Sequence, residues 1–146
     1  MANPLSANLK TGTLGELLVQ IRLLQYGVQS APPLKDTGND LIALKGNVCR
    51  AIQIKTLGIG VDVFNLDGNE LKRDFDILAL VNLRGENEEI YFDKSEIYLL
   101  WKADKPKTYY TLRELELSGW ELCKGRVDGL FSPELEGGII SFRQVR

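Results

Sequence analysis

The sequence predicts an α/β (α+β) fold in a single domain, residues 1–146, with a central mixed β-sheet flanked by helices. An amphipathic helical pattern near the N-terminus precedes a run of short strand patterns. One of these strands, residues 75–83, is almost continuously apolar, which is typical of a central strand covered on both faces. Only weak helical patterns follow it, and this order favours a mixed sheet with helices packed on it.

The first element is a helix that begins at Gly12 or Leu14 and ends at Tyr26. Apolar side chains recur at helical spacing, and Gly27 is a suitable C-terminal stop. Residues 30–39 contain two adjacent prolines and a Thr-Gly-Asn sequence, so we predict a loop there.

A β-hairpin follows, with strands at residues 40–44 and 48–56 and a tight turn between them. Ile52 and Ile54 alternate with Gln53 and Lys55 in the second strand. Because side chains alternate between the two faces of a strand, Gln53 and Lys55 share one face. The start of the first strand lies beside the end of the second in such a hairpin, which brings Asp40 within reach of both.

The rest of the chain gives weaker signals. Residues 57–73 are predicted to be a long loop with an extended piece near residues 61–64. Residues 89–93 are predicted to form a strand joined to residues 75–83 by a turn. The last two predicted elements are a helix at residues 111–117 and a strand at residues 138–142.

The composition excludes several kinds of chemistry. The chain has no histidine and only two cysteines, so it cannot form a Ser-His-Asp or Cys-His catalytic site, or a zinc site that needs imidazole. Acid–base or metal chemistry must therefore use carboxylates, lysine, amides and tyrosine. Among metal ions, Mg²⁺ is the natural candidate for such oxygen ligands.

The charge distribution argues against a protein that simply coats DNA. The net charge is −2, made up of +3 over residues 1–60 and −5 over residues 61–146. An enzyme acting on nucleic acid is less disfavoured, because bound metal ions supply positive charge. We find no apolar run long enough to span a membrane and no signal peptide, so we expect a cytoplasmic protein.

The hairpin carries the candidate site. The Asp40 carboxylate is suited to hold a divalent ion, and the Gln53 side-chain oxygen and the Ile54 carbonyl are further oxygen ligands. Lys55 is suited to orient a water molecule or to neutralise charge on a phosphoryl group. Glu16 adds a second carboxylate if the first helix packs across this edge of the sheet.

Each residue also has a purely structural interpretation. Glu16 fits a capping box with Thr13 as N-cap, and Asp40 fits a turn. Gln53 and Lys55 fit the solvated face of an edge strand. Their combination in this order favours a site, and Cys49 and Ala51 on the same face look buried.

These residues resemble the PD-(D/E)XK nuclease superfamily, in which a helix glutamate precedes an aspartate that opens one strand and a (D/E)-x-K sequence that closes the next. The resemblance covers about residues 12–95, with its matching stretches at residues 12–16, 38–44, 51–56, 74–81 and 89–92. Asn39 replaces the usual proline. Gln53 replaces the usual acid, and this Q-x-K form is similar to that of bacterial intron-encoded homing endonucleases.

The resemblance implies a restriction-endonuclease-like core and a DNA endonuclease that uses Mg²⁺ or Mn²⁺, homing- or restriction-like. Its catalytic residues would be Glu16, Asp40, Gln53 and Lys55, and its metal ligands Asp40, Gln53, Ile54 and Glu16. Cutting both DNA strands needs two sites, which implies a homodimer or homotetramer.

Two alternatives stay open at this point. One is a non-catalytic module with the nuclease fold that serves regulation or assembly on DNA, since an amide is a weaker metal ligand than a carboxylate. The other is an unrelated α+β protein. Outside the hairpin, several cations are candidates for phosphate contacts or for solvated surface, namely Lys72, Arg73, Lys102, Lys105 and Lys107.

Overall fold

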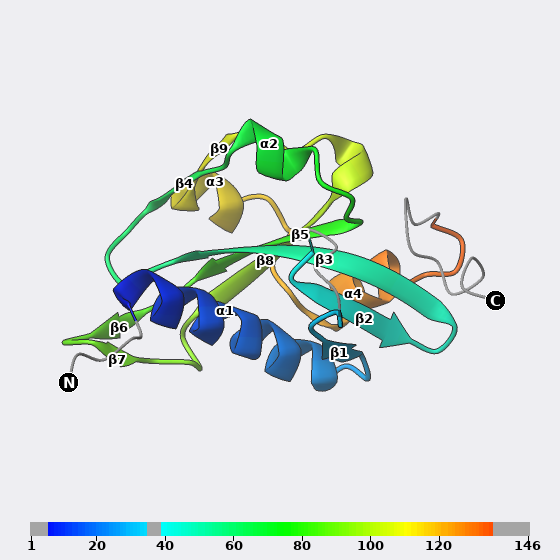
Figure 1. Cartoon of the computed structure of the whole chain (residues 1–146), viewed down its shortest axis with the longest axis horizontal. Helices are drawn as coiled ribbons and strands as arrows, with labels where there is room; N and C mark the ends of the chain where they lie inside the picture. Colours follow the sequence, from blue (N-terminus) through cyan, green and yellow to red (C-terminus); the bar gives the residue numbers. More distant parts are fainter. Residues whose placement is uncertain (1–5, 35–38, 136–146) are drawn as a thin grey trace.

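A computed structural model describes residues 6–34 and 39–135. A five-stranded mixed sheet forms its centre, and the order of the strands is β1-β2-β3-β5-β8 (Figure 1). Only β3 and β5 run parallel, and the other neighbours are antiparallel. The expected α+β class with a mixed central sheet is confirmed. The strands are β1 (Gln29–Ala31), β2 (Leu41–Lys45), β3 (Val48–Leu57), β5 (Ile77–Asn82) and β8 (Glu96–Trp101).

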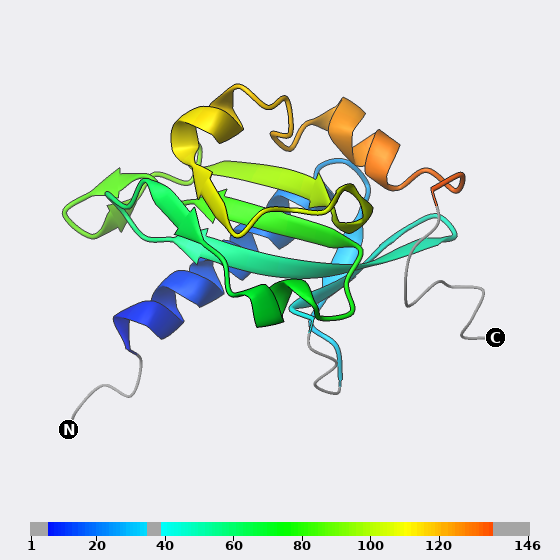
Figure 2. The same cartoon turned by 90° about the horizontal axis from the view of Figure 1, so that it is seen from above.

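Helices cover both faces of this sheet. The long helix α1 (Ala7–Leu24) lies on one side of the sheet, and the short helices α2 and α3 lie on the other (Figures 1 and 2). Within the described ranges, no helix is long and apolar enough to cross a membrane. The remaining elements are β4 (Val63–Asn65), α2 (Gly68–Leu71), β6 (Gly85–Glu86), β7 (Glu89–Ile90), η1 (Lys102–Asp104), β9 (Tyr109–Thr111), α3 (Leu112–Glu116) and α4 (Lys124–Leu130).

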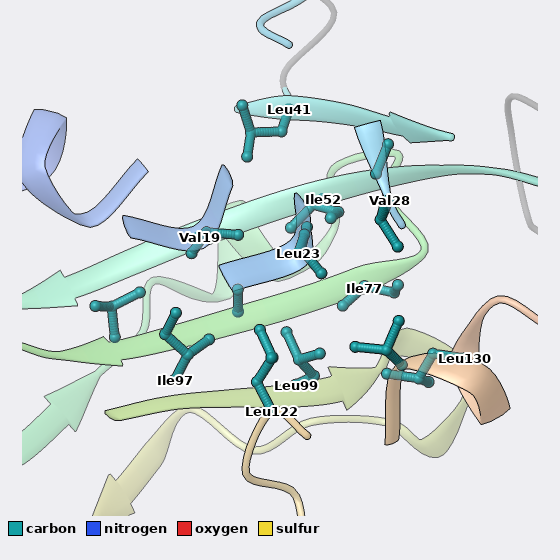
Figure 3. Packing of buried hydrophobic residues seen from close by; sticks show 14 of the residues in the cluster. Val19, Leu23, Val28, Leu41, Ile52, Ile77, Ile97, Leu99, Leu122 and Leu130 are labelled. Atoms are coloured by element: carbon teal, nitrogen blue, oxygen red, sulfur yellow. The ribbon is translucent and has the colours of Figure 1, made fainter. Parts of the chain in front are cut away.

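Side chains on one face of β3 form the core beneath α1. Ile52 packs in a cluster with Val19 and Leu23 of α1, Ile77 of β5 and Leu130 of α4 (Figure 3). All of these side chains are buried, as the alternation of the strand requires. This cluster fixes α1 and α4 on the same face of the sheet.

Side chains on the opposite face of β3 form part of a second core. Ala51 packs there with Phe64 of β4, Phe75 before β5 and Tyr110 of β9. Tyr110 also meets Trp120 edge to face, with ring centroids 6.1 Å apart. Every residue of β5 is buried, which confirms that the apolar run at residues 75–83 forms a strand covered on both faces.

The first helix begins earlier than the sequence predicts. Ser6 is the N-cap, and its Oγ accepts a hydrogen bond of 3.1 Å from the amide of Leu9. Thr13 therefore lies inside the helix, where its hydroxyl donates to the carbonyl of Leu9. The capping-box interpretation of Glu16 is wrong, because the amides near residue 13 already bond within the helix.

The strand predicted at residues 89–93 is wrong as a member of the main sheet. Glu89–Ile90 pairs only with β6 in a small hairpin, and its turn places Asn87 and Glu88 at positive φ. The neighbour of β5 is instead β8, a strand that is not predicted from the sequence. Because β7 is only two residues long, the residues that follow it can form another turn before β8 begins at Glu96.

Other expectations are partly corrected. The predicted loop at residues 30–39 begins with residues of β1, and the predicted loop at residues 57–73 contains β4 and α2. The helix predicted at residues 111–117 is confirmed as α3, which starts at a capping box formed by Thr111 and Glu114. Helix α4 was not predicted. The predicted strand at residues 138–142 lies outside the described residues.

Candidate active site

The site begins where β2 leaves β3 uncovered. The ladder between them ends at the pair Leu41 and Ile52, and in the described part of the chain no other strand pairs with this edge of β3. Asp40 extends the contact by one residue. Its amide donates to the carbonyl of Ile52 at 3.0 Å, and its Oδ2 accepts from the amide of Ile54 at 2.7 Å. The Asp40 side chain thus takes the place of a missing strand partner.

A glycine brings α1 against the same edge. Gly15 is buried, and a Cβ atom at this position would lie 1.9 Å from Oγ1 of Thr56. Only a residue without a side chain permits this approach. The next residue, Glu16, is therefore held beside the end of β3.

These elements enclose a cleft of about 600 Å³. Four of the predicted site residues line it together, namely Glu16, Asp40, Ile54 and Lys55. Gln53 is not among its described lining residues. The first turns of α1 and the loop after β3 complete the wall with Asn8, Thr11, Gly12, Thr56, Leu57, Gly58 and Val61.

Gln53 is buried rather than solvated. The residue is only 6% exposed, and its Oε1 accepts no hydrogen bond from the described residues. The alternative that Gln53 belongs to a solvated edge is therefore wrong. A buried amide oxygen without a donor is costly, and a cation is one species that can satisfy it.

Lys55 lies on the same face of β3 as Ala51 and Gln53, because these positions differ by two or four residues. It is partly exposed. With the described residues it forms no hydrogen bond or ion pair through its side chain. Its ammonium group is therefore available to a ligand in the cleft.

The two carboxylates of the cleft are hard to ionise together. Burial raises the pKa of Glu16, and the negative charge of Asp40 raises it further. Burial also raises the pKa of Asp40, although the amide of Ile54 and the positive charge of Arg73 partly oppose this. Two partly buried like charges favour a bound cation, which stabilises the ionised form of both.

Part of the environment of Asp40 is not predicted from the sequence. Arg73 and Glu70, at the end of α2, lie close enough to Asp40 for their charges to act on its carboxyl. Arg73 stood out only as one of several surface cations, and Glu70 lies in a segment predicted to be loop. The helical pattern also gave no reason to extend α1 back to Asn8 and Thr11.

The possible ligand atoms are oxygens, and they fit a hard cation that needs few carboxylate ligands. Across the described ranges, no three Asp, Glu, Cys or His side chains gather closely enough to hold a metal ion by themselves. The available oxygens are the carboxylates of Glu16 and Asp40, the carbonyl of Ile54 and the amide of Gln53. The Ile54 carbonyl faces the open edge because the amide and carbonyl of a strand residue point to the same side. Mg²⁺ fits such a site, since it commonly keeps several waters and binds one or two carboxylates.

Comparison with known proteins shows the fold. No family model matches the chain, and no curated protein is similar to it in sequence. Among solved structures, a bacterial homing endonuclease, I-Ssp6803I, superposes with a TM-score of 0.50 at 15% sequence identity. The match covers 82% of this chain and 87% of that chain. The chain therefore has the fold of a nuclease, with its cleft at the open edge of β3.

Proposed function

We propose that the protein is a metal-dependent DNA endonuclease of the PD-(D/E)XK type, in its Q-x-K form. The observation that carries the proposal is the convergence of Glu16, Asp40, Ile54 and Lys55 on one cleft. They come from a helix, a loop and a strand that the sequence separates by up to 39 residues. The similar fold of I-Ssp6803I, a homing endonuclease, supports the same activity.

The residues divide the work by their chemistry. Asp40, Glu16, the Ile54 carbonyl and Gln53 would hold Mg²⁺ or Mn²⁺, which supplies Lewis-acid activation of the phosphodiester and of water. Lys55 orients the attacking water and places a positive charge beside the phosphoryl oxygens as their charge increases. The hydrogen bond from Ile54 fixes the orientation of the Asp40 carboxylate.

A second candidate is a non-catalytic module with the same fold, acting in regulation or assembly on DNA. Two observations favour it. Gln53 stands where the family pattern has an acid, and no three acidic side chains among the described residues lie close enough to hold a metal ion. This candidate predicts DNA binding without cleavage.

The direct test is incubation of the purified protein with plasmid and linear DNA in Mg²⁺ or Mn²⁺. We expect cleavage that EDTA stops and that Asp40→Asn and Lys55→Met both abolish. Lys94→Met, a change of an exposed lysine in the turn between β7 and β8, is the matched control and should cleave normally. Cleavage that survives both site substitutions would defeat the proposal, and absence of cleavage with retained DNA binding would favour the non-catalytic module.

Cleavage of both strands needs two such sites, and we propose that a homodimer or homotetramer supplies them. Sedimentation analysis should show a species larger than the 16.4 kDa monomer. A monomer that only nicks plasmid DNA would contradict this part of the proposal.

A further inference from the structure

We propose that Arg73 is a further substrate-binding residue, whose guanidinium contacts a DNA backbone phosphate beside Asp40. The inference rests on the proposed function, because it names a group that binds the DNA strand next to the same cleft. It assigns a role to a cation that the catalytic pattern does not include.

The start of β5 places Arg73 near Asp40. Ala51 of β3 accepts a hydrogen bond of 2.8 Å from the amide of Asp76, and its own amide donates to Oδ2 of Asp76 at 2.8 Å. Asp40 bonds to the opposite edge of the same strand, at Ile52. The turn that leads into β5 therefore lies across one strand from Asp40. The charge of Arg73 acts on the Asp40 carboxyl, as this placement requires.

The backbone of Arg73 is held firmly. Its amide donates to the carbonyl of Glu70 at 3.2 Å, and its carbonyl accepts from the amide of Phe75 at 3.1 Å. Nζ of Lys102 also donates to this carbonyl, and the same ammonium lies 4.7 Å from the centre of the Phe75 ring. These contacts fix the point from which the arginine side chain extends.

The guanidinium itself has no partner among the described residues. Arg73 is exposed, and it forms no hydrogen bond or ion pair through its side chain within residues 6–34 and 39–135. An arginine fork binds a phosphate through two parallel hydrogen bonds. The backbone of Arg73 is fixed, and its guanidinium is unpaired among the described residues. It is therefore suited to bind the next phosphate of a DNA strand, just outside the acidic cleft.

Asp40 is thus approached from both layers of the fold. Glu16 lies on α1 on one face of the sheet, and Arg73 follows α2 on the other. The charge of Asp40 acts on Glu16, and the charge of Arg73 acts on Asp40. A cation bound between the carboxylates and a phosphate bound by Arg73 would lie on the two sides of Asp40.

The experiment measures DNA binding by fluorescence anisotropy in EDTA, so that no hydrolysis occurs. Wild type, Arg73→Gln and Arg73→Lys are compared on two short duplexes of unrelated sequence over a range of salt concentrations. Arg113→Gln is the matched control, because Arg113 is also exposed and without a side-chain partner among the described residues. Thermal melting of each variant verifies that it is folded.

We expect Arg73→Gln to weaken binding about tenfold on both duplexes and to reduce the slope of log K against log salt by about 1. Arg73→Lys should recover part of the affinity, and Arg113→Gln should bind like the wild type. Equal affinity and slope for Arg73→Gln and Arg113→Gln would overturn the inference. Wild type that binds neither duplex would overturn this inference together with the proposed function. Wild type that binds but never cleaves with Mg²⁺ or Mn²⁺ would overturn the endonuclease proposal alone.

Discussion

The carboxylate of Asp40 accepts a hydrogen bond of 2.7 Å from the amide of Ile54, two residues beyond the last ladder pair of β2 and β3. One oxygen of Asp40 is therefore committed to the backbone, and the other remains for a ligand. The same bond satisfies an amide that the end of β2 would otherwise leave unpaired. A structural bond and a binding group are thus combined in one side chain.

Asp40→Asn should stabilise the metal-free protein while it abolishes activity. The asparagine oxygen can still accept from Ile54, but the repulsion between Asp40 and Glu16 is gone. We expect a higher melting temperature than wild type at pH 7 in EDTA, and a loss of cleavage of at least about 100-fold. Lower stability of Asp40→Asn at this pH would show that the two carboxylates do not repel each other.

The raised pKa values of Glu16 and Asp40 predict how stability depends on pH. A carboxyl group whose pKa is higher in the folded state holds its proton more tightly there. The contribution of each group to the stability of the folded state is present below its ordinary pKa, 4.5 for Glu16 and 3.8 for Asp40. This contribution is lost as the pH rises through the raised pKa. The stabilisation by Mg²⁺ should increase over the same range. Melting curves with and without Mg²⁺ between pH 4 and pH 8 test both trends, and Glu16→Gln should flatten them.

Gln53→Glu should bind Mg²⁺ more tightly than wild type. Within the described ranges the buried Oε1 of Gln53 has no hydrogen-bond donor, and a carboxylate there adds a negative charge to those of Glu16 and Asp40. The same buried charge should lower the melting temperature in EDTA, because no cation then compensates it. Titration calorimetry gives the affinity. Gln53→Leu is the control that removes the oxygen, and identical Mg²⁺ affinity in all three proteins would mean that position 53 is not a ligand.

Gly15→Ala should impair both folding and catalysis. The new Cβ would lie 1.9 Å from Oγ1 of Thr56, so α1 must move away from β3 and carry Glu16 with it. Overpacking of this kind costs about 1–3 kcal/mol. Thr56→Ala removes the closest contact and leaves one of 2.8 Å, so the double variant should recover only part of the loss. Gly12→Ala, where a Cβ meets nothing within 4 Å, is the control for helix propensity in the melting measurements alone, because Gly12 lines the cleft.

Lys55→Met should lose catalysis but keep metal binding. Methionine retains most of the apolar stem and removes the charge that the proposal places beside the phosphoryl group. We expect kcat to fall about 100-fold or more, with an unchanged Mg²⁺ affinity by calorimetry. A variant that cleaves at the wild-type rate would remove Lys55 from the catalytic group.

The sequence predicted the hairpin well because its signals are local. Alternation in β3, the tight turn before Val48 and the position of Asp40 all follow from the chain itself. The order of the central sheet was harder. Residues 89–93 and residues 96–101 are both suitable neighbours for β5, and only the small hairpin with its positive φ angles at Asn87 and Glu88 excludes the first.

The candidate site could likewise be predicted only where its residues are related by local signals in the sequence. Asp40, Gln53 and Lys55 could be grouped because hairpin register relates them. Arg73 could not, because its relation to Asp40 depends on how the start of β5 pairs with Ala51 across the sheet. The burial of Gln53 was also not predictable from its strand alone, since it requires the second core to cover that face.

The asymmetry of α1 has a consequence for how such a protein can diversify. Its buried residues, Gly15, Leu18, Val19 and Leu23, all lie in the later part of the helix, whereas Asn8, Thr11 and Gly12 line the cleft. Side chains in the first two turns are therefore not buried in the core, whereas the later turns pack against it. Substitutions in these turns can therefore change the wall of the cleft without disturbing the packing of the core.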